Sequence, residues 1–390
     1  MKNDNNLIQL KLGKIYEEAM QYANDPSLYN GNAGICMFGL LYCKHFKDGE
    51  VDPKLGDNIQ KIIDEYLYLP SNTLANGKSG VNWFFLQMYK CDVIERQDLD
   101  EISFEDVNLS ETCIKMLSKG NYDFLHGSLG IAYYLLQKGI NSKFFVGYFR
   151  ILNHLFSKRK DGMIGNFNFI QDTIEEDRVN IGLAHGIVSI LKFCVQCYAN
   201  KVSKKASHAL AQKIINYLRS NQNVNKDCSY FSNLIIDNIE NNEGSRLGWC
   251  YGDLTIAYVL YQSAILFKDS DIEEFALEVF YHSMKRVTGE RTYVRDAGLC
   301  HGTAGIAHIY NKMWYLTKDK SFKNACDFWI DQTLKFDKFD DTISGYKLYY
   351  PPTNTYLPSS GLLEGSVGVG LVLISYLTGD FDWDYCLMLN

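Results

Sequence analysis

The chain has 390 residues, of which 46% are hydrophobic and 22% are charged, and its formal net charge is -7. This length and composition exclude long disorder, because such a chain can bury a large core. The acidic balance and the lack of a basic stripe exclude a nucleic-acid-binding protein.

Both ends of the chain favour a cytoplasmic protein that is not an integral membrane protein. Residues 1–12 lack the charged, apolar and small-residue parts of a signal peptide. The most apolar run, Val367–Leu377, contains two glycines and a serine, and it has about half the length that crosses a bilayer. The 11 cysteines of an intracellular chain are therefore expected to be mostly reduced and buried, with any functional ones acting as metal ligands or nucleophiles.

From the N-terminus onward, the predicted elements follow one pattern. An amphipathic helix is expected over about residues 7–23, and Ala206–Leu218 is a later example with apolar residues at helical spacing. Each such helix and its loop are followed by a short block of a glycine, two residues and a glycine or small residue, and then by an apolar stretch. No proline lies between Pro70 and Pro351, which permits helix after helix.

The block recurs seven times, with first glycines 46 to 66 residues apart. The copies are Gly31–Gly34, Gly77–Gly80, Gly127–Gly130, Gly186–Ser189, Gly252–Thr255, Gly302–Gly305 and Gly365–Gly368. Chance does not explain seven copies at such even spacing. The repeat predicts one domain over residues 1–390, an all-α, seven-fold α/α toroid with a double ring of outer and inner helices. An open solenoid is the alternative, but its end repeats should be polar, and the last repeat is apolar.

Chemically distinctive residues come directly before several of these blocks. They are Asp123 and His126, then His185, then Cys250 and Tyr251, then Cys300 and His301, and finally Glu364. In a ring of inner helices the helix starts share one end, so these residues would converge on one cavity. The set of Cys250, Cys300 and His301 suits Zn²⁺ with one open coordination position. From the spacing alone, the two cysteines could equally be small buried hydrophobes.

Four short motifs resemble those of a known family. They are Arg246-Leu-Gly-Trp-Cys250-Tyr-Gly, Cys300-His301-Gly, Leu183-Ala-His185-Gly and Tyr122-Asp123-x-x-x-Gly127. Together with the repeat, they make the whole chain similar to the lanthionine synthetase C-like family, the lanthipeptide cyclases. The resemblance implies one catalytic Zn²⁺ per chain, held by Cys250, Cys300 and His301. It also implies addition of a substrate cysteine thiolate to dehydroalanine or dehydrobutyrine, which closes a thioether ring.

The resemblance further implies that Asp123, His185, Arg246 and Tyr251 line the pocket. The addition generates an enolate, which needs a proton and a cationic or hydrogen-bonding partner. We expect His185 to act as general acid/base and Arg246 to stabilise the oxyanion. Asp123 would orient His185 or receive the proton of the incoming thiol. Without the resemblance, Asp123 and His185 could be helix caps and Arg246 a surface cation.

Some residues depart from the family pattern. Ser189 and Thr255 stand where the family tends to have glycine, and both are small enough to preserve the packing. His126 faces the same end of the predicted barrel and could be an additional pocket residue. Cys194 and Cys197 form a Cys-x-x-Cys sequence, which we interpret as part of the core rather than as a redox pair.

The implied partners are a dehydrated precursor peptide, a separate dehydratase and an exporter, with attachment to the inner membrane through these partners. A close alternative is the addition of glutathione to dehydroamino acids. A non-catalytic zinc- or thiol-binding module is another, although a structural zinc site needs no acid/base set. A carbohydrate-active toroid would need paired carboxylates, for which only Asp123 and Glu364 qualify, and it would leave the Cys-Cys-His set unexplained.

Overall fold

The protein is described by a computed structural model that covers residues 5–22, 25–102 and 106–390. The chain divides into two compact units. Unit 1 comprises residues 1–103 and 294–390, and unit 2 comprises residues 104–293. Within the described residues both units consist of helices with short two-stranded sheets, so the helical repeat predicted from the sequence is present in each.

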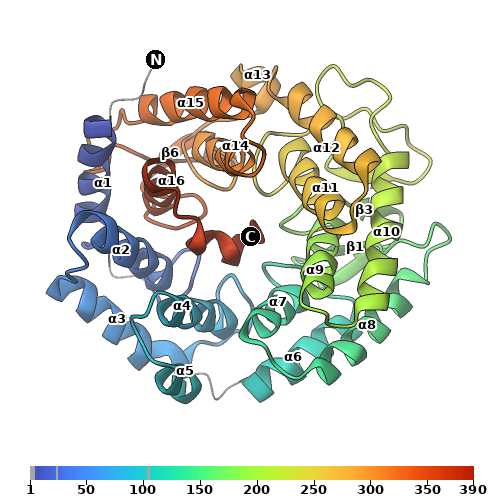
Figure 1. Cartoon of the computed structure of the whole chain (residues 1–390), viewed down its shortest axis with the longest axis horizontal. Coiled ribbons are helices and arrows are strands. Elements are labelled where there is room, and N and C mark those ends of the chain that lie inside the picture. The colour runs from blue at the N-terminus through green and yellow to red at the C-terminus, as the bar shows by residue number, and fades with distance from the viewer. Residues whose placement is uncertain (1–4, 23–24, 103–105) are drawn as a thin grey trace. The chain divides into compact units, whose positions relative to one another are not determined.

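Unit 1 contains a row of four apolar helices with outer helices beside them (Figure 1). In order of contact, the row is α14 (Thr303–Thr317), α16 (Ser366–Thr378), α2 (Asn32–Phe46) and α4 (Lys78–Lys90). The outer helices are α1 (Asn5–Ala19), α3 (Pro53–Glu65), α5 (Arg96–Ile102) and α15 (Lys320–Lys335). The smaller elements are η1 (Tyr66–Tyr68), η2 (Pro351–Thr353), η3 (Asp382–Leu387) and the antiparallel pair β5 (Leu348–Tyr350) and β6 (Thr355–Leu357).

A buried ionic cluster ties the C-terminal segment of unit 1 to its apolar row. Asp384 of η3 accepts hydrogen bonds from His308 Nε2 at 2.7 Å and from Lys312 Nζ at 2.6 Å, and both donors belong to α14. Burial alone raises the pKa of Asp384, but Lys312 and His308 outweigh it and hold this pKa below its usual range. Asp384 therefore favours its ionised form, as a buried carboxylate can when it is paired.

Unit 2 contains a second row of apolar helices (Figure 1). The row is α7 (Ser128–Lys138), α9 (Ile187–Ala199) and α11 (Asp253–Phe267), and the outer helices are α6 (Asp106–Ser118), α8 (Ser142–Phe156), α10 (Lys204–Ser220) and α12 (Ser270–Ser283). The short elements are α13 (Gly289–Thr292), the antiparallel pair β1 (Asn166–Asn168) and β2 (Thr173–Glu175), and the antiparallel pair β3 (Arg178–Asn180) and β4 (Leu234–Ile236).

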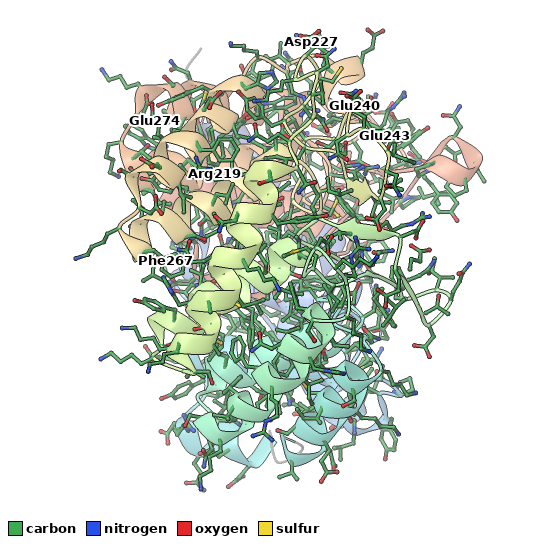
Figure 2. The ribbon with its side chains drawn as sticks, turned by 90° about the vertical axis from the view of Figure 1, so that its right-hand side faces the viewer. Arg219, Asp227, Glu240, Glu243, Phe267 and Glu274 are labelled. Carbon is green, nitrogen blue, oxygen red and sulfur yellow. The ribbon has the colours of Figure 1, made fainter. Side chains whose placement is uncertain are left out.

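The outer surface of unit 2 is charged. Figure 2 shows exposed Arg219 on α10 and Glu274 on α12, and it shows Asp227, Glu240 and Glu243 on the loops between α10 and α11. The apolar faces of the same helices point inward, where Leu210 and Ile214 of α10 are buried. The outer helices are thus amphipathic, as the periodicity of Ala206–Leu218 predicts.

Each apolar helix begins at the residue after the first glycine of a sequence block. The second glycine permits close packing, since a Cβ on Gly305 would lie 1.8 Å from the Leu299 carbonyl oxygen. Ser189 replaces this glycine on α9 and is buried, and its hydroxyl donates to the Gly186 carbonyl at 2.7 Å. Thr255, the replacement on α11, is also buried, so both departures from the family pattern are accommodated.

Three smaller expectations can also be checked in the described residues. Helix α1 ends at Ala19, earlier than the predicted end at residue 23, which lies outside the described residues. Cys194 and Cys197 on α9 are fully buried, as expected for core residues. No helix in the described ranges is long and apolar enough to cross a bilayer.

Candidate active site

A seven-residue loop precedes each apolar helix and ends at the first glycine of the block. We number these loops 1 to 7: Asp25–Gly31, Ser71–Gly77, Asn121–Gly127, Asn180–Gly186, Arg246–Gly252, Asp296–Gly302 and Ser359–Gly365. In six of the loops, the first side chain accepts a hydrogen bond from the backbone N–H of the third residue, at 2.7 to 3.3 Å. Loop 5 begins instead with Arg246, which has no side-chain acceptor.

Two positions in the seven loops differ consistently in burial. The fourth residue of every loop is apolar and buried: Leu28, Leu74, Phe124, Leu183, Trp249, Leu299 and Leu362. The sixth residue is polar or aromatic and at least partly exposed: Asn30, Asn76, His126, His185, Tyr251, His301 and Glu364. The buried fourth residue anchors each loop, so the sixth side chain lies outside the core.

Asp123 and His185 meet in unit 2, although they are 62 residues apart in sequence. Asp123 is fully buried, and its Oδ1 accepts the N–H groups of Leu125 at 2.8 Å and His126 at 2.7 Å. Its Oδ2 lies 2.6 Å from Nδ1 of His185. This contact places the His185 proton on Nδ1 and leaves Nε2 to face away from the carboxylate.

Neither residue caps a helix, so the capping alternative is wrong for both. Helices α7 and α9 begin at the N-cap glycines Gly127 and Gly186, without a side-chain cap. Asp123 instead organises loop 3 from within, and it holds the imidazole of loop 4.

Two opposing effects set the pKa of His185. Burial lowers it, but the hydrogen bond and negative charge of Asp123, together with Cys250, outweigh burial and raise this pKa above its ordinary value. The pKa of His126 is lowered instead. Burial is the main cause and the nearby His185 also lowers this pKa, whereas the negative charge of Asp123 raises it by less. The pKa values of the two neighbouring imidazoles are therefore shifted in opposite directions, and only that of His185 is raised.

Aromatic rings surround His185. Phe169, just beyond β1, stacks on His185 with ring centroids 5.1 Å apart and on His126 with centroids 4.7 Å apart. The rings of His126 and His185 are nearly parallel, at 6.0 Å. Tyr251 lies 6.2 Å from His185, and its hydroxyl accepts a hydrogen bond from Asn180 Nδ2 at 3.0 Å. His185 is thus held by a carboxylate at its edge and by rings beside it.

Loop 5 brings Arg246 and Cys250 to the same part of unit 2. The Cys250 carbonyl accepts the N–H groups of Leu183 at 2.9 Å and Ala184 at 3.2 Å, which fixes loop 5 against loop 4. The Arg246 side chain is half-buried, and within the described residues no hydrogen bond or ion pair holds its guanidinium. Arg246 is therefore less exposed than the surface-cation alternative requires.

Cys300 and His301 occupy the fifth and sixth positions of loop 6, in unit 1. The Cys300 N–H donates to the Leu363 carbonyl at 2.7 Å, and His301 Nδ1 lies 4.0 Å from Oε1 of Glu364. Cys250 belongs to unit 2, whereas Cys300 and His301 belong to unit 1. That these three residues bind one ion therefore stays a prediction. What unit 1 provides is an adjacent thiol and imidazole with a carboxylate beside the imidazole.

Sequence reasoning missed Asn180 and Phe169, both of which contact this site. Asn180 could have been found from the loop register, because six of the seven loops begin with Asp, Ser or Asn. Phe169 carries no such signal, since it lies beyond the repeat in the β1–β2 segment and reaches His185 only through the tertiary fold.

The family model for lanthionine synthetase C-like protein matches residues 22–388. The chain is 24% identical over 353 residues to the nisin biosynthesis protein NisC of Lactococcus lactis subsp. lactis, covering 81% of this chain and 79% of that protein. The solved structure of nisin cyclase matches with a TM-score of 0.74 and 18% identity, covering 100% of this chain and 98% of the other.

These matches settle the fold and the family. The likeness to nisin cyclase confirms the predicted fold class, an all-α α/α toroid. The family model spans nearly the whole chain. The chain therefore belongs to the lanthionine synthetase C-like family.

Proposed function

We propose that the chain is a zinc-dependent lanthipeptide cyclase that acts as one domain over residues 1–390. It would add peptide cysteine thiolates to dehydroalanine or dehydrobutyrine and so form lanthionine or methyllanthionine rings. The observation that carries the proposal is the Asp123–His185 pair, joined at 2.6 Å, in which His185 lies on loop 4, the loop that is hydrogen-bonded to the backbone carbonyl of Cys250. Family membership supplies the reaction class.

Cys250, Cys300 and His301 would hold one Zn²⁺, and their chemistry fits this ion. Two thiolates and one imidazole are common zinc ligands and leave a fourth position open. The residues come just before the first turns of α11 and α14, where the helix N-terminus favours a thiolate. Glu364 beside His301 is the kind of carboxylate that orients a metal-bound imidazole. When bound, the ion would lower the pKa of the substrate thiol.

His185 would supply the proton that completes the addition. A carbon–sulfur bond forms at the β-carbon, the carbon–carbon π bond breaks, and the negative charge moves onto the amide oxygen. The α-carbon then takes a proton from Nε2 of His185, since Asp123 occupies Nδ1. The raised pKa of His185 keeps a larger fraction of it protonated at neutral pH.

Arg246 would stabilise the enolate oxygen that forms in this step. Its guanidinium is half-buried and has no partner among the described residues, so it remains available to an incoming anion. A cation in a partly dry site interacts more strongly with a developing oxyanion than one in water. Tyr251, held by Asn180, would line the pocket beside His185.

The proposed substrate is a precursor peptide that a separate dehydratase has already dehydrated, with an exporter as a further partner. We propose a cytoplasmic location, with attachment to the inner membrane only through such partners. These proposals rest on family membership and on the similarity to the nisin biosynthesis protein.

The zinc content of the purified protein tests this proposal first. Native mass spectrometry should find one zinc per chain, and the double change Cys250→Ala and Cys300→Ala should remove it while the helical circular dichroism persists. Protein purified without chelator that lacks zinc would contradict the proposed chemistry. Enzyme that joins glutathione to a dehydroalanine peptide, but does not close a peptide ring, would point to glutathione as the thiol.

A further inference from the structure

Loop 5 lacks the hydrogen bond that closes the other six loops. In those loops an Asp, Ser or Asn side chain accepts the N–H two residues ahead. Arg246 can only donate, so it cannot close loop 5 in this way. Loop 5 nevertheless carries Arg246, Cys250 and Tyr251, the largest set of proposed site residues on any loop. Something else must hold it in place.

The substitute lies 34 residues beyond the loop. Arg286, between α12 and α13, is fully buried. Its guanidinium donates to the Ser245 carbonyl just before loop 5, to Asp253 Oδ2 just after it at 3.2 Å, and to the Arg291 carbonyl at 2.9 Å. One side chain thus bridges the two ends of loop 5.

Asp253 extends this bridge to a second segment. Its two carboxylate oxygens accept the N–H groups of Tyr230 at 3.0 Å and Phe231 at 3.1 Å. The chain enters α11 through Gly252, which has a φ of 95°, a left-handed conformation that other residues adopt only with strain. The Arg286–Asp253 pair therefore links both ends of loop 5 to the backbone of residues 230–231.

We propose that Arg286 is a positioning residue for the site, acting through the ends of loop 5 rather than on the substrate. Its planar fork donates to three acceptors from three different nitrogens, a spread that the compact ammonium group of a lysine does not match. By replacing the missing turn side chain, Arg286 leaves the first position of loop 5 open to Arg246. The part of this inference that concerns zinc and turnover rests on the proposed function.

Buried pairs also matter for folding, so the test needs a matched control. Lys312 and Asp384 form a second buried pair, on α14 and η3. We would compare Arg286→Lys and Arg286→Met with Lys312→Met. Arg286→Met and Lys312→Met each remove the cation of a buried pair, and Arg286→Lys keeps the charge but loses hydrogen bonds of the guanidinium, so all three variants should unfold more easily. Only the Arg286 variants should disturb loop 5.

The first measurement uses neither zinc nor substrate. Amide hydrogen exchange in the zinc-free protein is followed at two backbone N–H groups. The Leu247 N–H donates to the Thr292 carbonyl at 3.1 Å and reports local opening of loop 5. The Leu183 N–H donates to the Cys250 carbonyl and reports separation of loop 5 from loop 4. We expect faster exchange at both sites in the Arg286 variants, but not in Lys312→Met. Exchange in the folded Arg286 variants that equals the wild-type rate would overturn the proposal, whether or not the protein is a cyclase.

The second measurement is zinc affinity, by competition with a chelator. Loss of groups that position metal ligands typically lowers affinity about 10- to 100-fold, and we expect Arg286→Lys in the lower part of this range and Arg286→Met in the upper part. With a peptide that contains dehydroalanine and cysteine, kcat should fall while KM changes little. Should Arg286→Met fail to fold, Arg286→Lys and Asp253→Asn decide the question. Equal zinc affinity in wild-type and folded Arg286→Lys protein would contradict the proposal.

Discussion

Loops 4 and 5 lie side by side in unit 2 and have the same length, yet they are closed in different ways. Loop 4 is closed by its own Asn180, whose Oδ1 accepts the Gly182 N–H at 2.9 Å. Loop 5 begins with Arg246 and is bridged by Arg286 from a distant segment. A locally closed loop has its first residue committed to structure. A loop closed from outside leaves that position available for chemistry.

The largest expected effect is at the fifth position, which is Ala184 in loop 4 and Cys250 in loop 5. Cys250→Ala makes the two loops alike there, and we expect loss of bound zinc and of detectable cyclisation, because a thiolate ligand is removed. Cys194→Ala, a buried cysteine on α9, is the control and should retain zinc. Zinc content by mass spectrometry checks this, and full occupancy in Cys250→Ala would exclude Cys250 as a ligand.

The sixth position should give the next largest effect. His185→Ala in loop 4 removes the proposed proton donor, so kcat should fall roughly 10²- to 10⁴-fold. His126→Ala, the same change in loop 3, should have a much smaller effect, because His126 does not contact the Asp123 carboxylate through its ring. Rates of ring closure with a dehydrated peptide compare the two. Equal losses would remove the special role of His185.

The first position distinguishes the loops most directly. Arg246→Ala removes the proposed partner of the enolate, and the loss of one such group costs roughly 10²- to 10³-fold in kcat. The unfolding midpoint should change little, since Arg246 does not close its loop. Arg219→Ala, on the exposed face of α10, is the control. A large loss of stability in Arg246→Ala with normal turnover would mean that the residue is structural.

The link between loops 3 and 4 should appear in the pH dependence. Activity requires protonated His185, so it should decline as pH rises through the pKa of this residue, which Asp123 raises against burial. Asp123→Asn removes the negative charge, lowers that pKa and should move the decline to lower pH. A pH–kcat profile measures the shift. An unchanged profile would show that another group causes the decline in activity at high pH.

The smallest expected effect concerns the turn of loop 4. Asn180→Ala leaves the Gly182 N–H without its acceptor and the Tyr251 hydroxyl without its donor. The free energy of unfolding should fall by about 1–2 kcal/mol. Asn76→Ala, at the exposed sixth position of loop 2, should change it much less. Denaturant unfolding checks both, and similar values would contradict the structural role of the first position.

Much of the fold could be predicted from the sequence, because the repeat combines two local signals. The glycine blocks mark where the apolar helices start, and each of these helices begins at the residue after the first glycine of a block. The division into two compact units was not predicted, since it depends on contacts between distant segments. The start and end of α1 were only approximate, because weak amphipathic periodicity does not define a helix terminus.

The site was predicted less completely, and the reason is physical. His185 stands next to Gly186 and Cys250 stands two residues before Gly252, both in recognisable motifs, so the sequence marks them. Arg286 lies outside every repeat block, and its importance comes from burial and from three acceptors supplied by separate segments. Phe169 likewise reaches His185 only in three dimensions.

The central claim, that this chain closes thioether rings, is tested most directly with a synthetic peptide that contains one dehydroalanine and one cysteine. The peptide is incubated with the zinc-loaded protein, and its remaining thiols are alkylated and counted by mass spectrometry. We expect the alkylatable thiol to disappear without a change in peptide mass, and to persist with His185→Ala. A thiol that remains fully alkylatable in the presence of wild-type, zinc-bound protein would contradict the claim.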